Sequence, residues 1–464
     1  MEKKRNSFGG TLGFVLAAAG SAVGLGNIWR FPYLAAKDGG GLFLVIYLIL
    51  VVTFGFALLT SELAIGRKTR QSPLTAYKKV HKNWGFLGPI ASIIPFLIMP
   101  YYCVIGGWVL KYMMGFLTGA GTQMASDGYF TGFITGQWEP IIFLLIFLAI
   151  VAFVVIRGVD KGIEAMSKIV MPVLVIIVIG IAIFSLTISH TDGNVTRTGL
   201  DGLKAYVIPD LSGITLKQVL ITVMDAMGQL FYSISVAMGI MVAYGSYVKD
   251  DANLVKSINQ IEIFDTAVAF LAGAMIIPAI FVFQGAEGMQ ASGPGLMFVS
   301  LPKVFEQMGV VGNIVGALFF VMVLFAAVTS AVSILEAVTS SLMDEFGMSR
   351  TKAAVTESAV ALILGIIVCL GYNKFYFELP LPNGSTAQVL DIMDYVSNQV
   401  LMPILAIGTC ILIGWVVKPK YVIDEVTKNG EHFSRKTLYT IMVKYVTPAL
   451  LLLLFFQAIG VLRF

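Results

Sequence analysis

Charged residues, cysteines and histidines are all scarce in this chain, and each shortage excludes a class of protein. Only 12% of the 464 residues are charged, about half of the fraction in an average soluble protein. The three cysteines lie inside apolar runs, where a free cysteine behaves as a small buried hydrophobe. The three histidines lie far apart and have no metal-ligand spacing. The composition therefore argues against a water-soluble protein and against a metalloenzyme.

Long apolar runs dominate what remains. Hydrophobic residues make up 57% of the chain, and the mean hydropathy is +0.87. A helix that crosses a bilayer needs about 20 apolar residues, and the chain holds eleven runs that approach or exceed this length. They lie near residues 11–35, 41–66, 87–117, 140–156, 165–188, 216–246, 259–283, 311–341, 353–371, 386–415 and 438–461. The sequence thus predicts an all-α integral membrane protein, a single domain over 1–464 with about eleven transmembrane helices.

The basic residues predict how these spans are oriented. With the N-terminus on the cytoplasmic side, the N-terminal tail and the loops on that side hold 22 of the 31 Lys and Arg residues. Cytoplasmic loops carry such an excess of Lys and Arg in membrane proteins. We therefore expect a multi-pass protein of the plasma membrane with a cytoplasmic N-terminus and, after eleven spans, an extracellular C-terminus.

Two of the spans contain helix-breaking residues near their middle. The first carries Gly20, Gly24, Gly26 and Pro32, and the sixth carries polar residues and glycine over 228–239. Glycine costs about 1 kcal/mol and proline about 3 kcal/mol per helical position. Backbone that is broken at membrane depth persists only where it lines a cavity or is buried in protein. The alternative is that the glycines merely allow close helix packing.

The two breaks are five spans apart. Interrupted helices at matching positions of two halves indicate a transporter built on an inverted repeat, with its binding site at the breaks. The sequence then predicts a first repeat of five helices over 11–188 and a second over 216–415, with both first helices unwound in mid-membrane. The eleventh helix, 438–461, lies outside the repeats.

Three motifs in the first two spans are long and specific. They read Gly24-Leu-Gly-Asn-Ile-Trp-Arg-Phe-Pro32, Asp38-Gly-Gly-Gly41 and Glu62-Leu-Ala-Ile-Gly-Arg67. With them, the chain from about residue 7 to residue 460 resembles the neurotransmitter:sodium symporter family, in particular its bacterial amino-acid carriers. The resemblance implies sodium-coupled symport of an amino acid by alternating access, with two sodium ions bound near the middle of the bilayer.

The resemblance also implies the sodium ligands, all of which are hard oxygen donors. The first site takes the Ala22 carbonyl, the side chains of Asn27, Ser233 and Asp265, and the substrate carboxylate. The second site takes the carbonyls of Gly20, Val23 and Ala326 and the hydroxyls of Thr329 and Ser330. Hydroxyls within a helix can instead bond the carbonyl four residues earlier, and this alternative applies to Thr329 and Ser330.

Asp265 departs from the leucine-type pattern of the family, which has Asn at this position and Glu where this chain has Ala269. An intramembrane carboxylate is costly unless it is paired, and therefore indicates function. Animal members bind chloride beside the first sodium. Our hypothesis is that Asp265 supplies this negative charge, so that chloride is not required. A protonatable Asp265 also allows coupling to protons.

The resemblance places an amino acid in the site. Gly24 leaves no carboxylate in the pocket, so the substrate must bring its own, which would meet the N–H groups of Leu25 and Gly26 at a helix N-terminus and the hydroxyl of Tyr102. The expected contacts favour a neutral substrate with a hydrophobic or aromatic side chain. They are Ser21, Ala22, Leu25, Gly26, Ile98, Tyr102, Tyr232, Ser233, Ser235, Met238, Ser330, Ser333 and Ile334.

The resemblance also implies residues that close the outer and inner paths to the site. Arg30 and Asp394 resemble the pair that closes the outer path, and Arg5 and Asp344 the inner pair, with Tyr247 and Glu336 nearby. Arg5 has the alternative of a plain positive-inside anchor. Gly162 and Pro172 match a motif at which the fifth helix unwinds, although the same residues also fit an ordinary proline kink.

Other functions are less consistent with the sequence. The runner-up is a proton-coupled carrier that uses Asp265 or Glu336. A channel usually places such breaks around a pore between symmetric subunits. A membrane enzyme needs a nucleophile or a metal site, and we find no paired carboxylates, no His/Cys cluster and no Gly-rich phosphate loop. Beyond the amino acid and the lipid bilayer, the sequence indicates no nucleic-acid partner and no obligatory protein partner.

Overall fold

The computed structural model describes residues 7–209, 211, 214–289 and 292–462, and these residues are predominantly helical. The sequence prediction of an all-α protein is confirmed. The first half of the chain contains α1 (Thr11–Ala22), α2 (Phe31–Lys37), α3 (Gly41–Leu50), α4 (Phe56–Thr69), α5 (Pro73–Val80), α6 (Leu87–Leu117), α7 (Gly121–Ala125), α8 (Tyr129–Ile134), α9 (Glu139–Ile156), α10 (Ala165–Thr187), β1 (Ser189–Asp192), β2 (Val195–Thr198) and α11 (Gly199–Val207).

The second half contains α12 (Leu216–Ser233), α13 (Ile240–Tyr247), α14 (Leu254–Gly288), α15 (Gly293–Gly295), α16 (Leu301–Gln307), α17 (Val310–Phe346), α18 (Arg350–Leu370), β3 (Leu379–Pro380), β4 (Thr386–Ala387), α19 (Val389–Asp394), α20 (Met402–Ile411), α21 (Lys420–Val426), α22 (Lys436–Ile441) and α23 (Thr447–Ala458). Short π-helical turns join α3 to α4, α19 to α20 and α22 to α23, so each of these pairs continues as one rod.

The described helices match the predicted spans. Nine are long and apolar enough to cross a membrane, and α1 with the segment Gly26–Lys37 makes a tenth, bent by 53°. The remaining predicted run, 216–246, is divided into α12 and α13 by residues 234–239. The two irregular spans are thus the first and the sixth, as the glycines and polar residues predict.

The break in the first span follows from its sequence. Helix α1 ends at Ala22, and Val23 turns to an extended conformation with ψ of 96°. A π-helical turn over Gly26–Arg30 then leads into α2, with Pro32 in its first turn. Proline fits the first turn of a helix because no N–H is needed there. The chain therefore ends one helix and starts another at the glycines.

The break in the sixth span ends at Gly239, which has φ of +74°. A Cβ at this position would lie 2.6 Å from the carbonyl oxygen of Ala91 and 2.9 Å from Pro73. Glycine is required here both by its conformation and by the close approach of α5 and α6. The start of α13 therefore packs closely against α5 and α6.

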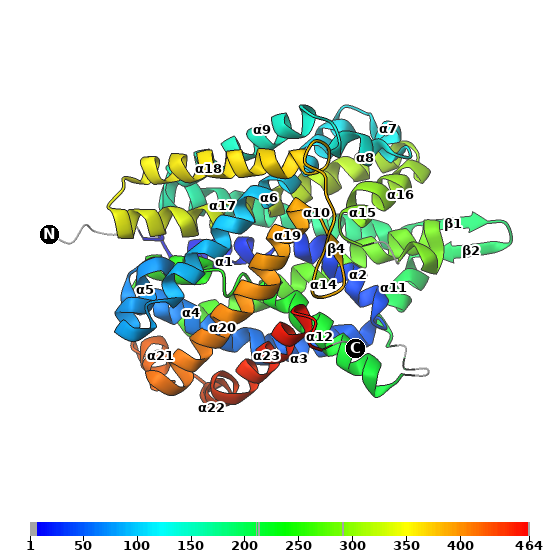
Figure 1. Ribbon diagram of the computed structural model, residues 1–464. Helices are drawn as coiled ribbons and strands as arrows, with labels where there is room; N and C mark the ends of the chain where they lie inside the picture. The colour runs from blue at the N-terminus through cyan, green and yellow to red at the C-terminus, as the bar shows by residue number, and fades with distance from the viewer. Residues whose placement is uncertain (1–6, 210, 212–213, 290–291, 463–464) are drawn as a thin grey trace.

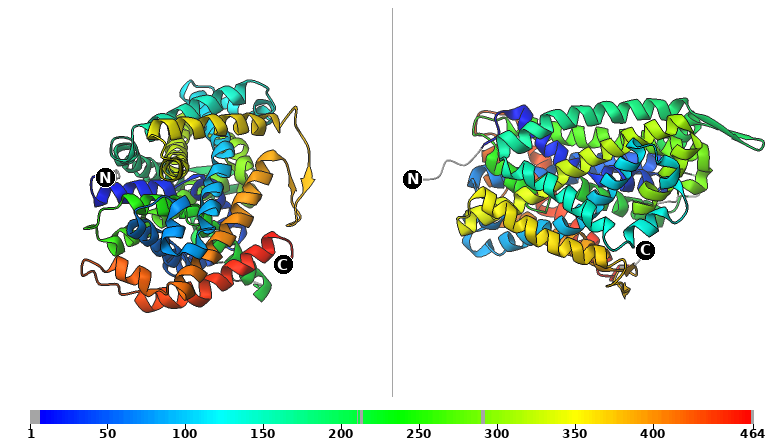
Figure 2. Two further views of the ribbon diagram at one scale, coloured as in Figure 1. Left: turned by 60° about the vertical axis from the view of Figure 1, so that its left-hand side comes forward. Right: turned by 90° about the horizontal axis from the view of Figure 1, so that it is seen from above.

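The broken helices lie at the centre of the molecule. Helix α1 packs against α14 and α17, and α13 packs against α4 and α17. Figure 1 shows α9 and α18 along the upper face and α20 to α23 along the lower face. The β1–β2 hairpin protrudes from the end opposite to the start of α1 in Figure 1, and the right-hand view of Figure 2 agrees.

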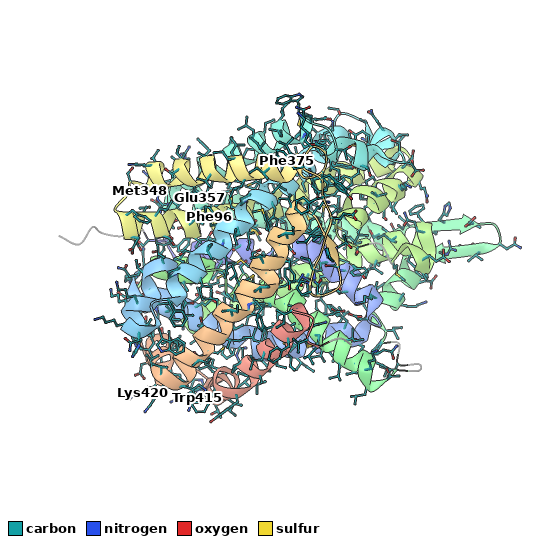
Figure 3. All side chains as sticks on the ribbon, in the orientation of Figure 1. Phe96, Met348, Glu357, Phe375, Trp415 and Lys420 are labelled. Carbon is teal, nitrogen blue, oxygen red and sulfur yellow. The ribbon has the colours of Figure 1, made fainter. Side chains whose placement is uncertain are left out.

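Lipid-compatible residues cover the outside. Ile169, Ile176 and Ile183 recur at intervals of seven residues along α10 and are 60–70% exposed. Such an apolar stripe is stable in hydrocarbon, where no water has to be ordered around it. Trp415 lies at the lower edge of the molecule in Figure 3, and both Trp415 and Phe375 are exposed. Trp415 contacts Tyr445 and Lys444, a combination that is typical of the membrane interface.

Candidate functional site

A buried pocket lies between the two broken helices. Its lining comes from the first break, from α6, from α12 and the second break, and from α17. The lining residues are Ser21, Ala22, Gly24, Leu25, Gly26, Asn27, Ile98, Tyr102, Tyr232, Ser233, Ser235, Met238, Ile240, Ser330 and Ile334. The free space between them is about 30 Å³, which is enough for water but too little for an amino acid. The side chains of the lining must therefore move when a larger ligand enters.

One end of the pocket is suited to a carboxylate. The hydroxyl of Tyr102 is buried near Ser330 and the N–H group of Leu25, but makes no hydrogen bond of ordinary geometry with any described residue. A Cβ at Gly24 would lie 2.9 Å from the Ser330 hydroxyl oxygen and 3.4 Å from the Tyr102 hydroxyl oxygen. Glycine thus keeps this end open, and an unpaired buried donor indicates a missing acceptor.

A carboxylate network adjoins the pocket at the place predicted for the first sodium ion. The Asn27 amide nitrogen donates to an oxygen of Asp265 at 2.8 Å, and the Ser233 hydroxyl lies 3.0 and 3.1 Å from the two Asp265 oxygens. Asn27 and Asp265 have no exposed surface. The amide oxygen of Asn27 accepts the Gly24 N–H. The structure therefore brings the predicted side-chain ligands together, next to Ala22 in the pocket wall.

Some of the oxygens predicted for the second sodium ion lie close together. The Ser330 hydroxyl lies 3.1 Å from the Ser21 carbonyl and 3.4 Å from the Val23 carbonyl. The Thr329 hydroxyl bonds the Phe325 and Ala326 carbonyls of its own helix, the alternative that the sequence left open. Thr329 also faces Gly20, because a Cβ there would lie 3.3 Å from the Thr329 Cβ.

The predicted substrate contacts line the pocket with one exception. Ser333 is fully buried behind the wall, where its hydroxyl donates to the Thr329 carbonyl and accepts from the Tyr244 hydroxyl at 2.7 Å. Ser333 therefore does not line the pocket in this structure, and its contact with the substrate stays a prediction. The family resemblance places it among the contacts, whereas its hydroxyl here bonds Tyr244 and the Thr329 carbonyl.

Two polar side chains behind the pocket were not predicted. A carboxylate oxygen of Glu62 accepts the Ala237 N–H at 2.6 Å, and the amide of Gln229 donates to the Gly26 carbonyl at 3.1 Å. Glu62 thereby satisfies an N–H group of the second break, and Gln229 adds a bond to the Gly26 carbonyl, which also accepts the Phe31 N–H. Glu62 belongs to one of the specific motifs, so its buried carboxylate was the available signal.

The predicted outer gate is not closed. Among the described residues Arg30 forms no ion pair within 4.0 Å, and the Asp394 carboxylate instead accepts bonds from Asn398 and Tyr101. Arg30 and Asp394 both line a cavity of about 760 Å³, as does Tyr232 of the pocket. Both charges border this cavity, and among the described residues no ion pair between them closes it.

The opposite side of the pocket is closed. Arg350 donates to both carboxylate oxygens of Glu336 at 2.6 and 2.9 Å, and the Tyr247 hydroxyl donates to Glu336 at 2.6 Å. The ring of Phe8 packs among Phe14, Tyr244 and Tyr247. The sequence pointed to Tyr247 and Glu336 but missed Arg350, the first residue of α18.

The other residues predicted for the inner gate give a mixed result. Asp344 accepts the backbone N–H of Ser72 at 2.6 Å, and Arg5 lies outside the described residues. Gly162 lies in a π-helical turn that continues into α10, with Pro172 inside that helix. The segment is helical here, and its unwinding stays a prediction. Within it, Glu164 accepts the Gly9 N–H at 2.6 Å, at the start of α1.

Known proteins give this site a context. The sequence model described as the Sodium:neurotransmitter symporter family matches residues 5–122 and 122–463. The uncharacterized sodium-dependent transporter YhdH of Bacillus subtilis is 32% identical, and the alignment covers 100% of both chains. The human sodium- and chloride-dependent GABA transporter 2 is 26% identical over 92% of this chain and 76% of its own length.

A solved structure is similar over almost the whole fold. The crystal structure of MhsT in complex with L-phenylalanine has a TM-score of 0.84 and 33% identity, and the match covers 98% of this chain and 100% of that chain. The family match and these identities extend well beyond the motifs around the pocket. The chain therefore belongs to the sodium:neurotransmitter symporter family, a family of transporters and not of enzymes.

Proposed function

We propose that this protein is a sodium-coupled symporter that takes up a neutral amino acid with a hydrophobic side chain by alternating access. The observation that carries the proposal is the pocket between the two helix breaks. It combines an unpaired Tyr102 hydroxyl, free helix ends and an adjoining Asp265 carboxylate. A zwitterion satisfies the first two features, and a hard monovalent cation satisfies the third.

The amino acid is oriented by its charges. Its carboxylate binds the N–H groups of Leu25 and Gly26 and the Tyr102 hydroxyl, because the pocket offers no anion of its own at Gly24. Its ammonium group faces the carbonyls of the break at 234–239. The side chain then meets Ile98 and Ile334, which are apolar and buried. In the similar MhsT structure the bound amino acid is L-phenylalanine.

Two sodium ions are carried as co-substrates. Asn27, Ser233, Asp265 and the Ala22 carbonyl hold the first together with the substrate carboxylate. The carbonyls of Gly20, Val23 and Ala326 and the hydroxyls of Thr329 and Ser330 hold the second. The Thr329 hydroxyl donates its proton to carbonyls of its own helix, so its lone pairs remain available to the second ion.

Asp265 makes chloride unnecessary in this proposal. A carboxylate beside the first sodium provides the negative charge in fixed form, and Asn27 and Ser233 donate hydrogen bonds to it. The GABA transporter relative is described as chloride-dependent. Uptake by the present protein should proceed equally when gluconate replaces chloride, and a collapse in gluconate would contradict this role of Asp265.

The open and closed sides of the pocket describe one step of the cycle. The cavity beside Arg30 gives access from outside, and the Glu336–Arg350 pair blocks the cytoplasmic side. A carrier has to be open to only one side of the membrane at a time, whereas a channel conducts through a continuous path. The protein works in the plasma membrane with a cytoplasmic N-terminus, and the proposed cycle requires no other protein.

Binding to the purified protein and transport in proteoliposomes test the proposal. We expect amino-acid binding in sodium but not in potassium or choline, and counterflow that saturates with substrate. Asp265→Asn removes a charge worth about 4 kcal/mol at 4 Å in an effective dielectric of 20, so sodium affinity should fall by about a thousandfold.

Thr329→Val is the companion variant. It keeps the shape of the side chain and removes the hydroxyl, so it should weaken sodium binding while the fold is retained. Amino-acid binding that is indifferent to the cation contradicts the proposal. Uptake driven by a proton gradient in the absence of sodium establishes the proton-coupled alternative instead.

A further inference from the structure

A lysine lies within the last membrane span without a carboxylate partner. Lys444 belongs to the helical rod Lys436–Ala458. On the same side of the rod, about one helical turn away, Ile441 is 47% exposed, so the lysine emerges on a surface that is suited to lipid. No described carboxylate lies within 4.0 Å of its ammonium nitrogen. A cation at such a position is costly unless it is paired.

Two aromatic side chains hold this lysine in place. The Trp415 indole N–H donates to the Lys444 carbonyl at 3.1 Å, and the Tyr445 ring meets the Trp415 ring edge-on at 5.4 Å. The Lys444 ammonium nitrogen lies 5.5 Å from the centre of the Trp415 ring, which attracts it but carries no charge to neutralise it. A Cβ at Gly414 would lie 3.2 Å from the Lys444 Cα. Glycine therefore lets the two rods cross closely and present these side chains together.

Two more lysines follow Trp415 in the chain. The π-helical turn Leu412–Val416 ends the rod that contains α20, and Lys418 and Lys420 come next, both exposed. Three residues of extended chain span at most about 10 Å, so Lys418 stays close to Trp415. Figure 3 places Lys420 at the same lower edge of the molecule as Trp415. The end of this rod therefore adds two positive charges beside Lys444.

The chain itself offers little to neutralise these charges. Residues 395–423 and 432–464 contain neither Asp nor Glu. The acidic residue that follows Lys420 is Asp424 of α21, which forms no ion pair within 4.0 Å with a described residue. Other lysines at this end of the molecule are paired, as Lys428 is with Glu425 at 3.1 Å. The anion that balances the three unpaired lysines must therefore come from outside the chain.

We propose that Lys444, Trp415 and Tyr445, together with Lys418 and Lys420, bind the headgroup of an anionic phospholipid in the leaflet nearer to the start of α1. The lipid phosphate accepts hydrogen bonds from the Lys444 ammonium group, and the two rings pack at headgroup level, as aromatic residues do at membrane interfaces. The acyl chains lie along the exposed apolar residues of the two rods. A zwitterionic headgroup has the same phosphate but adds a cation, which the lysines repel.

Lipid binding to the purified full-length protein tests this site. Delipidated protein in a neutral detergent is titrated with phosphatidylglycerol or with phosphatidylcholine of the same acyl chains, and native mass spectrometry measures the bound lipid. The wild type should bind phosphatidylglycerol more tightly by about tenfold or more, because each lysine near the headgroups contributes about fivefold. Lys444→Gln should reduce this preference by about fivefold. The triple variant Lys418→Gln/Lys420→Gln/Lys444→Gln should abolish it.

Lys352→Gln is the matched control. It removes an exposed lysine from the first turn of α18, which Figure 1 shows on the upper face, whereas α20 to α23 lie on the lower face. The lipid preference of this variant should equal that of the wild type. A loss as large as that of Lys444→Gln would show that net charge and not this site selects the lipid, and would overturn the proposal.

Three further outcomes would contradict the site. Equal binding of the two lipids by the wild type does so regardless of how any variant folds. Lys444→Gln with an unchanged melting temperature and an unchanged preference does so as well. Displacement of phosphatidylglycerol by an equal concentration of inorganic phosphate would assign the lysines to a free anion instead of a lipid. None of these results bears on the proposed transport function, because the lysines lie outside the pocket.

Discussion

Replacing Arg350 by methionine should open the cytoplasmic side of the transporter. Arg350 makes two hydrogen bonds to Glu336, a carboxylate with no exposed surface, and its own side chain is only 13% exposed. After the substitution Tyr247 is the only described donor left to Glu336. Removing one partner of a buried ion pair costs about 3–5 kcal/mol, because the other charge remains without compensation.

This cost applies to the closed arrangement. An open cytoplasmic side admits water to Glu336 and avoids most of the penalty. At about 1.4 kcal/mol per factor of ten, the ratio of open to closed protein should rise by a factor of about 100 to 3,000. Apparent sodium and substrate affinity should fall as well, since the competent state is less populated.

Thiol labelling measures this shift. Ser246→Cys places a small reporter in α13 at a position that is 1% exposed in the closed state, and the three native cysteines are buried. Labelling from the cytoplasmic side of inside-out vesicles should accelerate in the Arg350→Met background. The double variant Glu336→Gln/Arg350→Met removes both charges and should return labelling most of the way to the starting rate. Two results would refute the reasoning. One is an equal labelling rate in the presence and absence of Arg350, and the other is a double variant that is labelled as fast as Arg350→Met alone.

Three further predictions follow from other contacts. Tyr102→Phe should weaken amino-acid binding by about tenfold to a hundredfold, the value of a hydrogen bond to a charged group, and should leave the melting temperature unchanged because the hydroxyl has no described partner. Glu425→Gln should lower thermal stability strongly, because it removes the charge that faces the fully buried Arg67 guanidinium at 2.6 Å; an unchanged melting temperature would show that the Arg67 charge is compensated elsewhere. Between the first two spans, burial and then the charge of Asp225 raise the pKa of Asp38 to about 7. The folded state therefore holds a proton that the unfolded state releases, and stability should decline as the pH rises from about 4 through 7. The melting temperature of Asp38→Asn should therefore fall less with rising pH than that of the wild type. An equal fall in both proteins would contradict this contribution of Asp38.

The positions of the two helix breaks were predictable because their cause is local. Glycines and Pro32 destabilise a helix wherever they stand, so the sequence locates the first break without knowledge of its neighbours. The π-helical turn at Gly26–Arg30 and the bend of 53° are details that depend on packing. The hydrogen-bond partners of Asp265 were predictable for a similar reason, since a carboxylate within an apolar run needs a partner.

Contacts between distant segments were not predictable in this way. The bond from Ala237 to Glu62 joins residues 175 positions apart, and no local pattern specifies it. Arg350 is only 14 residues from Glu336, but their meeting depends on the loop between α17 and α18. The bond between Ser333 and Tyr244 joins residues 89 positions apart, and the sequence did not indicate it.

The shared residues of the pocket explain why sodium and the amino acid should bind together. Ser233 lines the pocket and bonds Asp265, and Asn27 joins the same carboxylate to the Gly24 N–H. A cation among these oxygens attracts the substrate carboxylate and fixes the loop that binds it. Each ligand thereby prepares the site of the other. Because a coupling free energy is reciprocal, the factor by which sodium raises amino-acid affinity must equal the factor by which the amino acid raises sodium affinity. If Asp265→Asn leaves this factor unchanged, the coupling does not depend on the Asp265 carboxylate, and the first sodium ion binds elsewhere.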